Sequence, residues 1–333
     1  MTNTISPMRS VIPILASLAL ALSSSSAQTD STIVLRFAGD CLLAGHYETE
    51  AGQNGGFAFE EFDLFKTDDI SLVNLECPIT HRGTKREKPF TFRMRPSYTR
   101  ALKDAGIDIV NLANNHVFDY GSEGIFDTFS YLDSIGIRHI GAGRTLLEAR
   151  RPVVVSLKGR RIGFLGYYSG GEAPNATDST AGVRQRALAS IEQDIRLVRE
   201  TDSADYVVVT FHWGDEKAES PDSGQIWFAR QTVRAGADAV IGHHTHVLSG
   251  IERYRNGVIV YSLGNFVFGG NARHTYDTAI FEIALTASGP KYTVIPVRVK
   301  KWKVTPLSGE PAESVVRQVK ERSSIFPKTI FTN

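Results

Sequence analysis

Side chains that commonly bind metals end several of the apolar segments in this chain of 333 residues. Five of the nine histidines fall in three short motifs, NLANNH, FHW and GHHTHV, each after a run rich in β-branched residues. Asp40 ends the run IVLRFAGD, and Glu76 ends ISLVNLE in the same way. Ligands of open α/β sheets bind beyond the carboxyl ends of strands. The sequence therefore predicts that these distant residues meet at one site.

The apolar segments predict an α/β fold. Continuous apolar runs are typical of strands covered on both faces, and they lie at 32–38, 70–75, 107–112, 153–157, 161–167, 206–211, 237–242, 258–263, 278–285 and 292–299. Helical spacing is found at 97–105, 121–134, 184–200 and 224–235. This alternation indicates parallel sheet, and the later strands, which lack helices between them, indicate an antiparallel edge or a second sheet.

Residues 1–27 have the features of a secretory signal. Arg9 is their only charge, residues 11–22 are apolar, and Ser-Ser-Ala at 25–27 offers a cleavage site. The apolar run is shorter than a membrane span of about 20 residues. We therefore expect export to the periplasm or the cell exterior, and an uncleaved signal would anchor the protein instead. Without Arg9, the 37 basic residues become 36 against 36 acidic ones, which argues against a nucleic-acid partner held by bulk charge.

Cys41 and Cys77 are the only cysteines, and each directly follows a proposed acidic ligand. They could pair in an oxidising compartment, although two cysteines do not make a disulfide-built scaffold. Two unpaired thiols in a packed region are the alternative.

The histidine motifs carry the strongest local signals. If the backbone of GHHTHV is extended, His244 and His246 face one metal centre, and His243 faces away and donates a supporting hydrogen bond. Imidazole suits zinc, iron and related transition metals. In NLANNH, Asn115 offers a carbonyl oxygen and His116 is a candidate general acid. An Asn-rich turn is the alternative interpretation of that motif.

The remaining candidates are a histidine and three carboxylates. His212 ends a buried run, and Glu216, four residues later, is a candidate either to contact substrate or to support a metal ligand. Asp40 and Glu76 would each serve as an ordinary helix cap when taken alone. A carboxylate shared by two cations is, however, typical of sites in which metal ions activate water.

The segment from Arg82 to Arg95 is strongly basic, with six basic residues against one acidic residue. A solvated loop accounts for most of these charges. Arg93 and Arg95 in FTFRMRP are the exceptions, and we expect them to bind an anionic substrate through their guanidinium groups.

Seven motifs, taken in order, resemble the CapA family of poly-γ-glutamate capsule-synthesis proteins: AGDCLLAGH, SLVNLECPIT, FTFRMRP, NLANNHVFDYG, FHWGDE, GADAVIGHHTHVLSGIE and VIVYSLGNFVFG. The resemblance runs from about residue 33 to residue 285. That family is similar to calcineurin-like metallophosphatases, which implies a four-layer α/β/β/α sandwich with mixed sheets around a two-metal site. The corresponding domain would span residues 32–305, followed by a polar tail at 306–333 with a short helix near 313–321.

The resemblance also implies roles for individual residues. His116 would act as the transition-state acid, and the ligands of one or two divalent ions (manganese, iron or zinc) would be Asp40, Glu76, Asn115, His212, His244 and His246. Two departures concern the first motifs: Leu42 replaces a histidine, and Glu76 replaces an aspartate. His46 is a candidate to compensate or to contact substrate. One metal position (Glu76, Asn115, His212, His244) is therefore more complete than the other (Asp40, Glu76, His246).

The implied function is poly-γ-glutamate capsule synthesis or export by an exported protein with a metal-dependent hydrolase-type site. Its partners would be an anionic substrate, either a phosphoester or poly-γ-glutamate, and membrane-bound polymer-synthesis proteins. The alternatives are a phosphoesterase or γ-glutamyl hydrolase unrelated to capsule, and a non-enzymatic scaffold that handles polymer. A nucleotidase would need an aromatic pocket for the base, and core packing accounts for the candidates Tyr167, Tyr168, Trp213 and Phe266.

Overall fold

The computed structural model describes residues 1–3 and 32–332. Apart from its first three residues, the predicted signal segment lies outside the described residues. Within the described ranges, no helix has both the length and the apolar character needed to cross a membrane.

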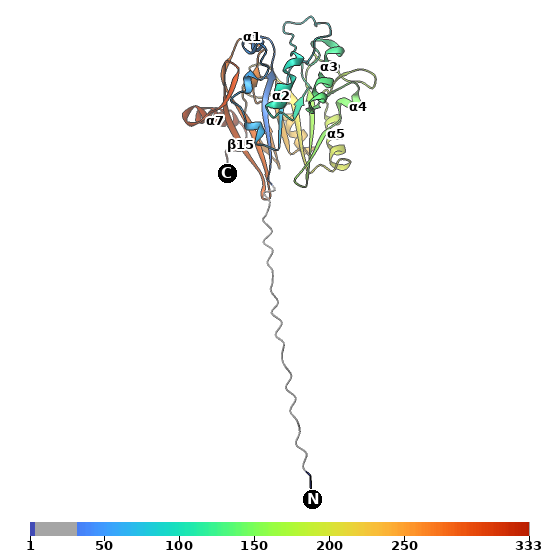
Figure 1. Ribbon diagram of the computed structural model, residues 1–333, viewed down its shortest axis with the longest axis vertical. Helices are drawn as coiled ribbons and strands as arrows, with labels where there is room; N and C mark the ends of the chain where they lie inside the picture. The colour runs from blue at the N-terminus through green and yellow to red at the C-terminus, as the bar shows by residue number, and fades with distance from the viewer. Residues whose placement is uncertain (4–31, 333) are drawn as a thin grey trace. The chain divides into compact units, whose positions relative to one another are not determined.

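Two mixed sheets form the centre of the domain (Figure 1). The first has the order β16-β15-β14-β1-β2-β3-β4, and β13 also pairs with β1. Its strands β1 to β4 are parallel, whereas β14 to β16 are antiparallel. Its members are β1 (Ile33–Leu42), β2 (Ile70–Leu75), β3 (Ile109–Asn111), β4 (Arg138–Ile140), β13 (Asn265–Phe268), β14 (Thr275–Thr286), β15 (Gly289–Lys300) and β16 (Lys303–Pro306).

The second sheet has the order β11-β12-β10-β9-β7-β6. Its members are β6 (Val153–Leu157), β7 (Arg160–Tyr168), β9 (Tyr206–His212), β10 (Ala239–His243), β11 (Ile251–Tyr254) and β12 (Gly257–Val260). A separate small ladder joins β5 (Ala142–Gly143) to β8 (Gly182–Val183).

The helices are short to medium in length. The α-helices are α1 (His46–Ala51), α2 (Thr99–Asp104), α3 (Gly121–Ser134), α4 (Leu146–Ala149), α5 (Leu188–Glu200), α6 (Ser223–Arg234) and α7 (Gly309–Ser323). Three 3-10 turns are η1 (Phe57–Phe59), η2 (Leu64–Lys66) and η3 (Pro96–Tyr98).

Three apolar cores separate four layers. In β2, Leu72 packs into the core between the sheets, and its neighbour Val73 packs into a second core with residues of α2 and α3. In β9, Val208 enters the core between the sheets, whereas Val207 packs with residues of α5 and α6. Successive strand residues point to opposite faces, so each sheet is covered on both sides. This arrangement confirms the predicted α/β/β/α sandwich and explains the continuous apolar runs.

The C-terminal segment is packed, which differs from the expected polar tail. Helix α7 is longer than the predicted short helix, and Val315 and Val319 on it are buried in the core between the sheets. Phe326, after the helix, is buried beside Tyr261 with ring centroids 5.0 Å apart. Figure 1 shows α7 and β15 toward the left of the domain and α4 and α5 toward the right.

Candidate metal centre

Polar residues from both sheets meet where their strands end. Asp40 near the end of β1 is in register with Asn74 of β2, and Glu76 comes directly after β2. In the second sheet, His212 ends β9 directly opposite His243, the last residue of β10. Strand order therefore brings together residues that are far apart in the sequence, as their positions predict.

Two glycines in the motifs permit the close approach of backbone to backbone. A side chain at Gly39 would lie 1.9 Å from the carbonyl oxygen of Gly264, which accepts a hydrogen bond from the Asp40 amide. A side chain at Gly242 would lie 1.9 Å from the carbonyl oxygen of Tyr261. The glycines of AGD and GHH are therefore required by packing next to the site.

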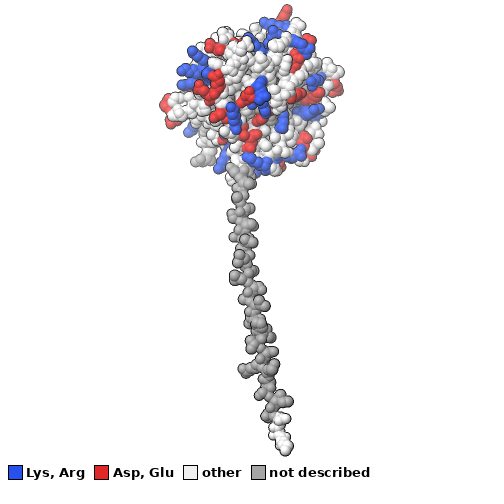
Figure 2. Space-filling model, viewed as in Figure 1, with Lys and Arg blue, Asp and Glu red and all other residues white. Residues whose placement is uncertain are grey.

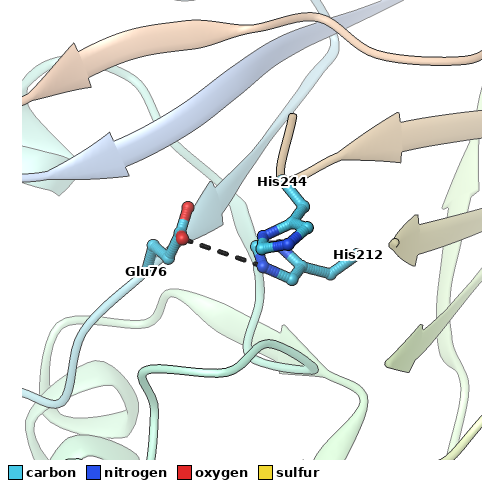
Figure 3. A group of neighbouring side chains, drawn as sticks. All are labelled: Glu76, His212 and His244. Carbon is cyan, nitrogen blue, oxygen red and sulfur yellow. Dashed lines mark ion pairs between the residues drawn. The ribbon is translucent and has the colours of Figure 1, made fainter. Parts of the chain in front are cut away.

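The first donor group comprises Glu76, Asn115, His212 and His244. The candidate ligand atoms of Glu76 and the two histidines lie within 4.8 Å of one another. The histidines come from the ends of neighbouring strands, and Glu76 Oε1 lies 3.7 Å from His212 Nε2 (Figure 3). Asn115 Oδ1 lies 2.9 Å from the same histidine nitrogen. The four residues of the predicted fuller position are thus immediate neighbours.

The second donor group comprises Asp40, Glu76 and His246, with ligand atoms again within 4.8 Å of one another. His246 Nδ1 lies 3.1 Å from Asp40 Oδ2, and its Nε2 lies 3.8 Å from Glu76 Oε1. Glu76 Oε1 therefore faces histidines of both groups, as a bridging carboxylate would. Leu42, which replaces the family histidine, is buried among apolar side chains and adds no donor.

The loop that carries His244 and His246 is not extended, which differs from the extended backbone that the sequence analysis assumed in order to bring both rings to one centre. Their φ values are 96° and 58°, in the left-handed region that residues with side chains rarely adopt. The chain turns at both residues, and the two rings therefore reach different donor groups. Strain of this kind persists where the surrounding structure holds it and is concentrated at functional sites.

His243 does not make the predicted supporting hydrogen bond. Its Nδ1 lies 3.8 Å from Asp40 Oδ1, which is too far for one. Neither ring nitrogen has a hydrogen-bond partner within the described part of the chain. Burial lowers the pKa of His243 to about 4, so the ring is neutral at pH 7.

Burial shapes the charge of the donors. Desolvation, followed by the neighbouring Asp40 carboxylate, raises the pKa of Glu76 well above its ordinary value. Burial would also raise the pKa of Asp40, but the hydrogen bond and charge of His246 outweigh it and lower that pKa. Desolvation and neighbouring histidines lower the pKa values of His212 and His244. Both rings are therefore neutral at pH 7, as metal ligands must be.

This donor set fits a divalent transition-metal ion. Imidazole, carboxylate and amide oxygen together suit manganese, iron and zinc. Glu76 Oε1 is buried without a hydrogen-bond partner among the residues described, although buried polar atoms are normally paired. A cation would supply that partner and offset the buried negative charge.

Buried asparagines hold the carboxylates, a role that the sequence analysis missed. Asn74 Nδ2 donates to Asp40 Oδ1 at 2.8 Å and to Glu76 Oε2 at 3.2 Å. Asn74 Oδ1 in turn accepts from the side-chain amides of Asn111 at 2.9 Å and Asn114 at 3.3 Å. The signal was present in the NLE and NLANN motifs, whose first asparagines lie within strands that are otherwise apolar.

His116 is supported by two charged residues that the sequence analysis did not assign to it. Its Nδ1 lies 2.7 Å from Asp119 Oδ2, and Asp119 Oδ1 lies 2.7 Å from Lys88 Nζ. Lys88 Nζ also donates to the backbone oxygen of Asn115 at 2.9 Å and reaches Glu172 at 3.1 Å. Lys88, which is half-buried, is thus a connector between loops. The Asp119 contact leaves His116 Nε2 available for chemistry.

The proposed substrate residues lie around the centre at different depths. Arg93 and Arg95 border a cavity of about 420 Å³ together with Phe92, whose ring is 4.7 Å from that of His116. Glu216 is exposed, and its negative charge adds to the larger effects of burial and Asp40 in raising the pKa of Glu76.

His46 is exposed at the first position of α1 and belongs to neither donor group. It therefore does not replace the histidine missing at Leu42.

Comparison with known proteins places the site residues inside one family match. The family described as "Bacterial capsule synthesis protein PGA_cap" matches residues 34–270. The chain belongs to this family. The match includes every residue of both donor groups and His116, whereas α7 and the residues from Asn271 onward lie beyond it.

Two relatives carry capsule-related names. The PGA biosynthesis protein CapA of Bacillus subtilis (strain 168) is 30% identical over 306 residues, covering 89% of this chain and 80% of the relative. The capsule biosynthesis protein CapA of Bacillus anthracis is 29% identical over 307 residues, covering 88% and 74%. Among solved structures, the NAD nucleotidase of Haemophilus influenzae matches with 12% identity and a TM-score of 0.48, covering 90% of this chain and 64% of that one.

Other side chains near the centre of this PGA_cap protein are structural. Tyr167, Tyr168, Trp213 and Phe266 are all buried, in agreement with core packing. Both cysteines are free and buried, so of the two alternatives the structure has the unpaired thiols. Burial raises the pKa of Cys41 to about 12.

Proposed function

We propose that this chain acts in poly-γ-glutamate capsule synthesis or export as an exported protein with a metal-dependent hydrolase-type site. The PGA_cap family membership and the capsule-related names of its relatives support the process. The signal-like N-terminal sequence supports export to the periplasm or cell exterior, where membrane-bound polymer-synthesis proteins would be its partners.

One observation carries the hydrolase part of the proposal. Glu76 belongs to both donor groups, and the neighbouring loop presents His116 with its Nδ1 already engaged by Asp119. A shared carboxylate and a positioned acid are the two elements that hydrolysis of an anionic polymer or phosphoester needs.

The residues would divide the work as follows. A metal ion held by Glu76, Asn115, His212 and His244 would supply Lewis acidity and make water more acidic. Asp119 keeps the proton of His116 on Nδ1 and orients the ring. When the ring carries a second proton, on Nε2, His116 can deliver that proton to the leaving group and return to the neutral ring with its proton on Nδ1. Lys88 meanwhile holds the Asn115 carbonyl and the Asp119 carboxylate in place.

A scaffold without enzymatic activity is the second candidate. The second donor group favours a scaffold because it has only three donors, and Leu42, which stands where the resemblance implies a histidine, adds none. Phosphoester or γ-glutamyl hydrolysis outside capsule formation would use the same donors and differs only in substrate.

The test is turnover by purified protein loaded with manganese. Poly-γ-glutamate would be followed by chain length, and aryl phosphate esters by released phenol. We expect His116→Ala to abolish hydrolysis while metal content stays unchanged, and His274→Ala, an exposed histidine outside both donor groups, to leave both unchanged. Cleavage of neither substrate by metal-loaded wild-type protein would leave the scaffold as the function.

A further inference from the structure

Two cavities adjoin the candidate metal centre. The first, of about 370 Å³, is bordered by His246 of the second donor group, by Arg273, and by residues of α7. The second, of about 420 Å³, is bordered by Phe92 and Arg93. The first adjoins the second donor group through His246, and the second adjoins His116 through Phe92.

A row of rings connects the two cavities. Ring centroids of His246 and Phe268 lie 4.5 Å apart, those of Phe268 and Phe92 lie 6.2 Å apart, and those of Phe92 and His116 lie 4.7 Å apart. His246 borders one cavity and Phe92 the other. The two cavities are therefore neighbours across a short row of packed rings, and that row includes His246 of the second donor group.

Most charges at the cavities are already neutralised by neighbours. Arg95 is paired with Glu48 at 2.7 Å, and Arg322 is paired with Glu219 at 2.5 Å. Asp277, in the first cavity, is paired with Arg298 at 2.6 Å. These pairs leave little net charge to attract a ligand.

One arginine in each cavity is the exception. Within the described part of the chain, neither Arg93 nor Arg273 has a carboxylate partner, and each instead lies over a tyrosine ring. Arg93 is 4.6 Å from the ring centre of Tyr120, and Arg273 is 5.4 Å from that of Tyr276. A guanidinium held against an aromatic face keeps its N–H groups free for two parallel hydrogen bonds to a carboxylate.

Attraction of an anionic ligand would come from individual arginines and not from the charge of a whole face. Figure 2 shows acidic and basic side chains intermixed over the visible face of the domain. Because the overall charge is nearly balanced, recognition of an anion depends on the positions of single unpaired cations, and one of these lines each cavity.

We propose that the two cavities are subsites for one extended polyanion, with Arg93 and Arg273 binding carboxylates on either side of the metal centre. The ligand is a flexible chain with one carboxylate per repeat unit, whose methylene groups contact Phe92. Poly-γ-glutamate has this chemistry, so the inference rests on the proposed function and deepens it. A small phosphoester would fill only one subsite.

Binding of fluorescent γ-glutamate oligomers to the purified full chain tests the proposal without requiring turnover. A dimer and an octamer would be titrated by anisotropy against wild type, Arg93→Gln, Arg273→Gln and the double variant. The matched control is Arg317→Gln, which removes the same charge from α7 at a residue paired with Glu310 and outside both cavities.

For the octamer, we expect each single variant to weaken binding about three- to tenfold, as partly exposed charge-assisted contacts do. The double variant should show the product of the two effects, because the sites are separate. For the dimer, which occupies one subsite at a time, each single variant leaves the other subsite intact and should change binding little, whereas the double variant should lose binding at both. The control should match wild type.

Two results would overturn the proposal in distinguishable ways. If wild type binds the octamer but the arginine variants do not weaken it, or the double variant equals a single one, the two-subsite inference fails and the proposed function stands. If metal-loaded wild type binds neither oligomer, the polymer substrate of the proposed function fails with it.

Discussion

The two donor groups share Glu76 but differ in how far the protein itself satisfies their atoms. In the second group, His246 Nδ1 lies near Asp40 Oδ2 at 3.1 Å and Asn265 Oδ1 at 2.8 Å, so the acidic and basic members already neutralise each other. In the first group, His244 Nδ1 is buried without a hydrogen-bond partner among the described residues, and both histidines are neutral at pH 7. The first group has a donor atom without a partner in the protein, and it has four donors instead of three. It should therefore hold metal more tightly than the second group.

The largest effect should come from Glu76, because it serves both groups. We expect Glu76→Gln to lose metal from both positions, as measured by metal analysis after dialysis. The same change should raise the melting temperature of the metal-free protein, since it removes a carboxylate whose ionisation burial and Asp40 oppose. Retention of metal at the wild-type level by Glu76→Gln would show that the carboxylate bridges nothing.

Replacing one histidine from each group tests the comparison itself. His244→Ala should weaken the tightest metal by more than about 100-fold, beyond the range for supporting residues. His246→Ala should leave that affinity within about tenfold and remove only weaker binding. Calorimetric titration with manganese and zinc would measure both. Equal losses in the two variants would mean that the groups are a single site.

Loss of the contact between Asp119 and His116 should reduce turnover and leave metal binding intact. Asp119→Asn is expected to reduce turnover about 10- to 100-fold, as loss of a group that orients a catalytic histidine does. Asp127→Asn is the matched control, because Asp127 is paired with Arg82 and makes no contact with His116. A loss of bound metal in Asp119→Asn, in step with the loss of turnover, would assign Asp119 to the metal site instead.

The smallest effect concerns His243, behind Asp40 of the second group. Its pKa is about 4 in the folded protein, below the ordinary 6.5, so the unfolded chain binds the proton first on acidification. Stability of the metal-free protein is therefore complete above pH 6.5 and should fall by on the order of 3 kcal/mol toward pH 4. His243→Gln should flatten this pH dependence in urea unfolding. An unchanged slope would place the acid sensitivity in other groups.

Much of the fold could be predicted because its strands are long, apolar and covered on both faces. The bounds of β2, β6 and α3 agree with the pattern in the sequence. The sequence analysis missed β4, β11, β13 and β16, which have three or four residues each and exist through pairing with distant partners. A pattern of so few residues has no period to detect.

The donor residues could be predicted for a similar reason, since each stands at the end of a recognisable strand. The left-handed turns at His244 and His246 could not, because only tertiary contacts hold residues with side chains in that region. Lys88 was indistinguishable in sequence from its solvated neighbours, and its burial against Asp119 depends on how two loops fold over the centre.

Metal analysis of the wild-type protein after reconstitution and gel filtration tests the central claim most directly. The account predicts one tightly held divalent ion per chain, a second that is lost on dilution, and a higher melting temperature when metal is present. Protein that remains metal-free after reconstitution, with an unchanged melting temperature, would contradict it.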